Sequence, residues 1–113
     1  MAWALALWLA CGGEDRPDLP SPFTSLQDAA RGAVVKEVDP KHLHLEWVGG
    51  DFNTVANRIV GQLERDGWVR TEEKGMGTML GIDLARGTER WSLILARHSN
   101  QVDAVLDVEA DAP

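Results

Sequence analysis

Several residue types and motifs that often indicate the function of a protein are scarce or missing in this sequence. It contains one cysteine, Cys11, so no disulfide can form within the chain and the fold must be held together by packing. It contains three lysines and no run of basic residues, and its formal net charge is −7. Phosphate binding needs clustered Lys and Arg, so this charge balance argues against a nucleic-acid partner. It also disfavours electrostatic docking on anionic lipid.

Long hydrophobic runs and common catalytic motifs are missing as well. The apolar stretch at the N-terminus is ten residues long, about half of the ~20 that a helix needs to span a bilayer. No Gly-x-Ser-x-Gly motif occurs, and no serine has a histidine partner that the sequence can place. Gly75, Gly77 and Gly81 do not have the spacing of a dinucleotide-binding loop. We therefore expect a protein that is not an enzyme and that needs no cofactor.

The length of 113 residues is enough for one domain. A chain of this size buries roughly two thirds of its unfolded surface, so a modest core can form without cross-links. Composition predicts four segments. They are a signal-peptide h-region (1–10), a Pro- and Gly-rich tether that begins at Cys11 (11–24), a single folded domain (25–110) and a disordered tail (111–113).

Residues 51–67 have the clearest periodicity in the chain. Asp51 is a good N-cap, and Gly67 stands where a left-handed C-terminal cap belongs. Apolar side chains between them recur at the three- and four-residue spacing of one helix face: Phe52, Val55, Ala56, Ile59, Val60 and Leu63. This segment is therefore the main predicted helix. A shorter helical turn is expected over residues 25–31.

Alternation of apolar and polar residues predicts strands on both sides of that helix. The expected strands are 33–38, 42–48, 68–71, 78–85, 91–96 and 102–109, and residues 72–77 are expected to form a turn. Short turns make neighbouring strands antiparallel. The predicted fold class is therefore α+β. We expect a two-layer sandwich with one main helix packed on a mostly antiparallel sheet of about five to six strands, in the order β-β-α-β-β-β-β.

The first eleven residues, MAWALALWLAC, carry a resemblance to a known family. The apolar stretch fits a signal-peptide h-region, and Leu9-Ala10-Cys11 resembles the end of the lipobox of bacterial lipoprotein precursors. In that family the cysteine is acylated and becomes the N-terminus after cleavage. The alternative is that residues 1–10 are ordinary structure and that Cys11 is an unmodified thiol. The later layout also resembles small lipoprotein domains of uncharacterised role, on the residues Leu19-Pro20, Val34-Val35 and Gly67-Trp68.

The resemblance implies an address and a broad role. It implies a lipoprotein of the bacterial cell envelope, anchored to the membrane through lipid on Cys11 and acting as a non-catalytic binding or structural module. Its partner would be an unidentified envelope protein. Gly12 replaces the aspartate that retains some lipoproteins in the inner membrane, which favours the outer membrane facing the periplasm. Two alternatives stay open: an unlipidated soluble interaction module or inhibitor, and a small metal-dependent enzyme.

The metal-dependent alternative would use His42 and His44. These histidines are two apart on one expected strand, so their side chains point to the same side and could hold zinc. Glu46 lies farther along, and His98 would come near only if the strands align. The competing interpretation is a solvated polar face. We interpret the acids at 103, 107 and 109 as a charged face that keeps the last strand soluble and protects it from edge pairing.

The sheet face away from the helix offers one more candidate site. Met79, Ile94 and Val105 alternate with the expected core positions, so they fall on that outer face, together with Ala85 and Ala96. Acidic residues are interspersed among them. Such an apolar patch with an acidic rim is typical of an interaction surface. The alternative is that these are scattered apolar side chains, which every protein surface contains.

Overall fold

The computed structural model describes residues 16–109. The predicted signal peptide, the start of the predicted tether and the tail 111–113 lie outside these residues. A short 3₁₀ helix η1 (Thr24–Leu26) comes first, followed by strands β1 (Val34–Asp39) and β2 (His42–Val48). The α-helix α2 (Phe52–Arg65) is followed by four strands: β3 (Val69–Met76), β4 (Met79–Arg86), β5 (Glu89–His98) and β6 (Gln101–Glu109).

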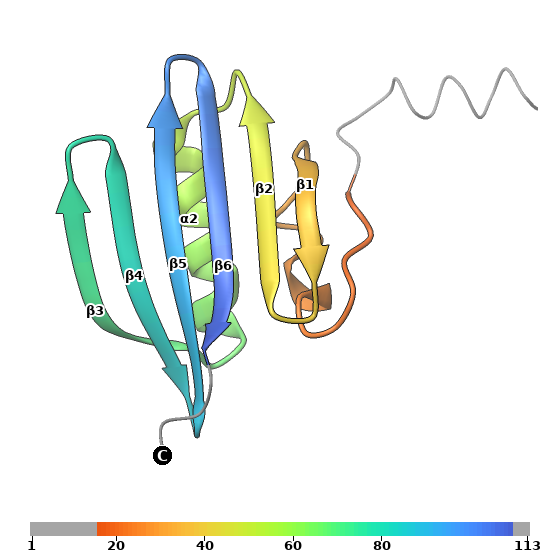
Figure 1. Cartoon of the computed structure of the whole chain (residues 1–113), viewed down its shortest axis with the longest axis vertical. Helices are drawn as coiled ribbons and strands as arrows, with labels where there is room; N and C mark the ends of the chain where they lie inside the picture. The colour runs from red at the N-terminus through yellow and green to blue at the C-terminus, as the bar shows by residue number, and fades with distance from the viewer. Residues whose placement is uncertain (1–15, 110–113) are drawn as a thin grey trace, which may run out of the picture.

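The six strands form one antiparallel sheet in the order β1-β2-β6-β5-β4-β3, shown in Figure 1. This confirms the coarse fold class of one helix with an antiparallel sheet. Along the chain, the predicted order β-β-α-β-β-β-β differs from the observed one in that it leaves out the 3₁₀ helix η1 before β1. The order within the sheet, which was not predicted, places the last strand β6 between β2 and β5. Strands hold 51% of the described residues, so the sheet dominates the domain.

Helix α2 begins and ends where its caps predict. The Asp51 carboxylate accepts a hydrogen bond from the Thr54 backbone N–H at 2.9 Å. At the other end Gly67 has φ +98°, and the Trp68 N–H donates to the Leu63 carbonyl at 3.0 Å. This pair of features is a Schellman cap, which turns the chain directly into β3. The face that α2 buries carries Val55, Ile59 and Leu63, as the periodicity predicts.

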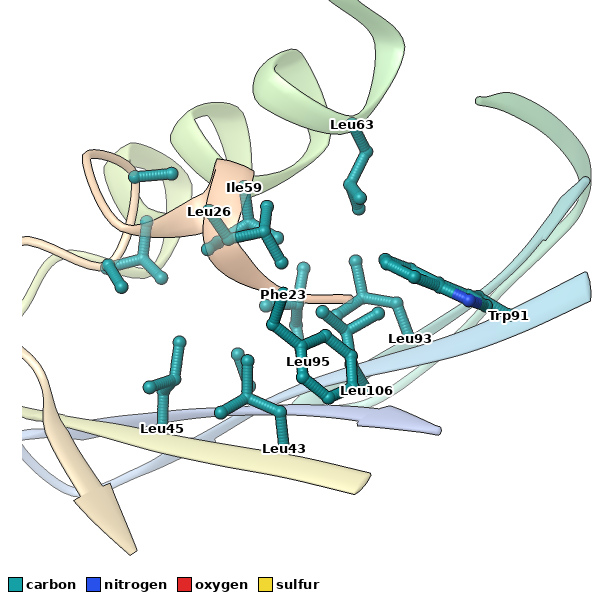
Figure 2. Close-up of a cluster of buried hydrophobic side chains, with 14 of the residues drawn as sticks. Phe23, Leu26, Leu43, Leu45, Ile59, Leu63, Trp91, Leu93, Leu95 and Leu106 are labelled. Atoms are coloured by element: carbon teal, nitrogen blue, oxygen red, sulfur yellow. The ribbon is translucent and has the colours of Figure 1, made fainter. Parts of the chain in front are cut away.

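The core lies between α2 and one face of the sheet. A row of fully buried side chains crosses four adjacent strands, with Leu43 opposite Leu106, Leu106 opposite Leu93, and Leu93 opposite Ile82. Figure 2 shows the leucines of this row facing Ile59 and Leu63 of the helix. Each such side chain contributes about 1.5–3 kcal/mol by leaving water. Three tryptophans complete the buried set: Trp47, Trp68 and Trp91.

The predicted tether is wrong for residues 19–24. Leu19 is 4% exposed and Phe23 is fully buried. Figure 2 places Phe23 between α2 and the sheet, and its ring centroid lies 5.4 Å from that of Trp91. The Leu19 N–H also donates to the Gln27 side chain at 3.0 Å. Prolines led us to expect an extended linker, but they flank two large apolar side chains whose burial fixes the segment on the domain. The folded part therefore begins before residue 25.

The predicted turn over residues 72–77 is also wrong. Strand β3 continues to Met76, and only Gly77 and Thr78 connect it to β4. Its charged residues suggested a turn, but β3 is an edge strand whose residues are all exposed, where charges are readily solvated. The other edge strand, β1, is also exposed at every residue except Val35, which is half-buried. Both edges contain a register irregularity, which together with the charges discourages pairing with another chain.

The burial of Phe23 gives the first testable prediction. Phe23→Ala should lower the free energy of unfolding by about 3–5 kcal/mol, because it removes a large side chain from the core and leaves a cavity. Urea unfolding followed by circular dichroism measures this. Ser25→Ala, at an exposed position of the same segment, should change stability by no more than about 0.5 kcal/mol. Equal stabilities of the two variants would mean that this segment does not belong to the core.

Candidate functional site

The face of the sheet turned away from α2 is not covered by any of the described elements. Both α2 and η1 contribute to the core on the opposite face, and Figure 1 shows the strands in front of α2. We call this surface the open face. Its residues alternate with the core positions on the four central strands: His42, His44, Glu46, Met79, Gly81, Asp83, Ser92, Ile94, Ala96, Asp103, Val105 and Asp107.

An apolar strip crosses the open face. Ile94 lies directly opposite Val105, and Met79 lies opposite both Ala96 and Met76. Ile94 is 36% exposed and Met79 is 40% exposed, which is high for side chains of this size. The strip consists of Met76, Met79, Ile94, Ala96 and Val105.

The strip contains all three residues that the sequence placed in a contact surface. Register brings Ile94 and Val105 into one cross-strand pair, and Met79 lies beside Ala96 on the same face. Ala85 does not belong to the strip, because it lies opposite Arg90 and Val69 near the other end of β4. Alternation alone places residues on a face, whereas the distance along that face depends on register.

Carboxylates border the strip on both sides. Asp103 lies opposite Ala96 on one strand and Glu46 on the other, and it is 9% exposed. Asp107 lies opposite Ser92, which in turn lies opposite Asp83. These acids do not protect an edge strand, as we first interpreted them, because β6 lies between β2 and β5 in the centre of the sheet. Their negative charge is instead concentrated around the apolar strip.

All three histidines of the chain face an aspartate of β6. The His42 Nδ1 atom lies 2.5 Å from Asp107 Oδ1. His44 Nε2 and His98 Nε2 each lie 3.4 Å from one oxygen of the Asp103 carboxylate, approaching it from strands on either side. Asp103 is therefore the centre of a polar cluster that joins His44, 59 residues away on β2, to His98 on the β5 strand of its own hairpin.

The candidate metal ligands do not converge on one point. His42 and His44 are directed at two different aspartates. Within residues 16–109, no group of three or more His, Cys, Asp or Glu side chains is arranged to hold a metal ion. In the same part of the chain, no serine or threonine hydroxyl is hydrogen-bonded to a histidine.

Gln101 holds the carboxylates of the cluster in place. Its side-chain amide donates to Glu46 Oε2 at 3.1 Å and to the Asp103 carboxylate at 3.3 Å. Lys36 on the edge strand β1 lies 3.9 Å from the same Glu46 oxygen. The role of Gln101 could not be predicted from the sequence, because a glutamine at the start of a strand carries no signal of its own. These bonds fix the rim of the open face.

The His42–Asp107 contact makes this face sensitive to pH. The hydrogen bond to the Asp107 carboxylate raises the pKa of His42, and the nearby charges of Asp107, Glu37 and Asp39 act in the same direction. Partial burial opposes the shift. Protonation of His42 therefore strengthens its hydrogen bond to Asp107. It also adds one positive charge, so the net charge of the rim becomes less negative.

Comparison with known proteins gives no family for this chain. No protein-family model matches it, and a search of curated proteins finds no match. Among residues 16–109, no helix combines the length and apolar character needed to cross a bilayer. Cys11 and the rest of the lipobox-like sequence lie outside the described residues.

The pKa shift of His42 predicts a pH-dependent contribution to stability. Because the folded-state pKa is raised, the pair stabilises the fold fully below the unfolded value of about 6.5, and this contribution is lost as pH rises through the folded-state pKa. Asp107→Asn should therefore destabilise the protein more at about pH 5.5 than at about pH 8.5. Urea unfolding at both pH values measures the difference.

Asp83→Asn is the matched control, because Asp83 lies in the same row of the open face and is not hydrogen-bonded to a histidine within residues 16–109. Its effect should not change with pH in this range. If Asp107→Asn costs the same at both pH values, the two groups are not coupled in the folded state.

Proposed function

We propose that this chain is a small, non-catalytic binding module of the bacterial cell envelope and that it docks a protein partner on its open face. The supporting observation is the Ile94–Val105 pair, an apolar centre on an uncovered sheet face with carboxylates on both sides. In this proposal the domain acts as a two-layer sandwich. Helix α2 and residues 19–33 form the supporting layer, and the sheet presents the docking surface.

The charges of the open face define the chemistry of the partner. An apolar strip bordered by Asp83, Asp103 and Asp107 is complementary to an exposed apolar contact flanked by Lys or Arg. A second copy of this chain is a poor occupant, since docking two open faces would bring their carboxylates together on a chain of net charge −7. The partner is therefore a different protein with a basic rim.

Lipid on Cys11 would hold the module at the membrane. The support for this step is the resemblance of Leu9-Ala10-Cys11 to a lipobox. More than one acyl chain on that cysteine would make the anchor stable, whereas a single chain binds membranes only reversibly. Gly12 favours the outer membrane facing the periplasm. A soluble module without lipid would use the same open face, so the two alternatives differ only at Cys11.

The docking surface can be tested by cross-linking in cells. With a photoreactive residue in place of Ser92, beside the strip, we expect a discrete adduct whose yield falls at high salt, because the rim is charged. Ile94→Lys should abolish the adduct, since it places a charge in the apolar centre. Val38→Lys is the matched control, because Val38 is 40% exposed and lies opposite Leu43, on the other side of the sheet.

Two results would contradict the docking proposal. One is an adduct that survives Ile94→Lys in a variant shown by circular dichroism to be folded. The other is a cross-linked partner surface that carries acidic residues around the contact. The first result would make the strip an ordinary part of the solvent-exposed surface, and the second would overturn the basic rim assigned to the partner.

The anchor has its own test. When the full chain is expressed in a bacterium that processes lipoproteins, mass spectrometry should find residues 1–10 removed and acyl chains on Cys11. Cys11→Ser should leave the protein unmodified and shift it from the membrane fraction to the soluble fraction. A Cys11→Ser protein that remains in the membrane fraction would exclude lipid on this residue as the anchor. An unsubstituted chain without acyl groups would support the alternative of a soluble module.

A further inference from the structure

A cavity lies between the first turn of α2 and the end of the β3–β4 hairpin, and Met79 is the one residue that it shares with the apolar strip. Its volume is about 330 Å³, at the lower end of the range for small-molecule sites. The residues around it come from α2, from both strands of the hairpin and from β5: Phe52, Asn53, Gly75, Gly77, Thr78, Met79, Leu80 and Arg97. We call it the Arg97 pocket.

The lining of the Arg97 pocket carries a positive charge, although the chain as a whole is acidic. The protein has 18 acidic residues and a net charge of −7, yet the only charged residue lining the pocket is Arg97. The Arg97 guanidinium lies 6.0 Å from the centroid of the Phe52 ring, so a cation and an aromatic surface stand side by side. The Arg97 backbone N–H donates to the Thr78 carbonyl at 2.9 Å, which ties the hairpin end to β5.

The donors of Arg97 are not taken up by a neighbouring acid. Among residues 16–109, the ion pairs of the arginines involve Arg16, Arg31, Arg70 and Arg86 and do not include Arg97. Hydrogen bonds from the Thr54 backbone N–H and side chain lower the pKa of Asp51, and the nearby charge of Arg97 adds a smaller effect in the same direction. Those bonds, both 2.9 Å long, hold the Asp51 carboxylate at the start of α2.

Gly75 keeps the pocket open. It stands within strand β3 opposite Leu80, where a glycine lowers strand stability because it adds backbone freedom and no packing. A Cβ built on Gly75 would meet no atom within 4 Å, and its φ is not in the left-handed region. Neither crowding nor backbone conformation therefore requires glycine at this position. A side chain at this position would extend into the pocket beside Leu80.

We propose that the Arg97 pocket binds a small monocarboxylate whose apolar group is about the size of an aromatic ring. The carboxylate accepts hydrogen bonds from the Arg97 guanidinium and the Asn53 amide, and the apolar group packs on Phe52 and Leu80. A guanidinium matches a planar carboxylate with two parallel N–H donors. A cationic ligand would be repelled, and a phosphate dianion would find only one cation. This site is independent of the open-face docking and of lipid on Cys11.

The test is a titration of the folded protein with phenylacetate, followed by amide chemical shifts in two-dimensional NMR. Saturable shifts are expected at Asn53, Thr78 and Arg97. The uncharged analogue 2-phenylethanol should bind about tenfold more weakly, since it loses the charge-assisted hydrogen bonds. The cationic analogue 2-phenylethylamine should give no saturable shift at these residues. Equal affinity for the acid and the alcohol would overturn the proposed role of Arg97.

Two variants and one control complete the experiment. Arg97→Gln should weaken phenylacetate binding about tenfold or more, and Gly75→Ile should abolish it by filling the pocket. Gly75→Ile should also leave the melting temperature unchanged or higher, because isoleucine favours a strand. Arg58→Gln, on the exposed side of α2, should leave binding unchanged. Absence of saturable shifts with phenylacetate, benzoate and hexanoate, or binding unaffected by both pocket variants, would refute the site.

Discussion

The pairing of β2 with β6 is the interaction on which the rest of the structure depends. Seven residue pairs, from His42 opposite Asp107 to Val48 opposite Gln101, join the first hairpin to the last strand of the chain. On one face this register completes the row of leucines under α2. On the other face it places the histidines of β2 against the carboxylates of β6. A shift of one residue would move both sets to the wrong side of the sheet.

The parts of the fold that the sequence predicted correctly are local. The caps and periodicity of α2 involve residues within a few turns of one another, and strict alternation identified β2 at its observed bounds. The errors concern segments whose own composition points away from their state. Leu19 and Phe23 stand among prolines and are buried because the core of a distant sheet receives them. The charged residues of β3 carry no apolar alternation and form a strand because the adjacent strand β4 pairs with them.

The candidate site could likewise be predicted only in its local features. Alternation placed Met79, Ile94 and Val105 on one face, because the side-chain period of a strand is set by its backbone. That Ile94 meets Val105, and that Asp103 receives two histidines, follows from register between strands and could not be predicted. The Arg97 pocket was hidden for another reason. Gly75 was assigned to a turn, where glycine needs no explanation, and its meaning changes once it is seen inside a strand.

Burial of Leu19 limits how far the domain could stand from a membrane. Eight peptide units separate Cys11 from Leu19, and a fully extended chain covers at most about 29 Å over that length. With lipid on Cys11, Leu19 would stand no farther from the anchor than about 29 Å, a distance close to the intermediate dimension of the domain, 30 Å. Partners within the same bilayer, or bound closely to it, would meet the domain at a high effective concentration.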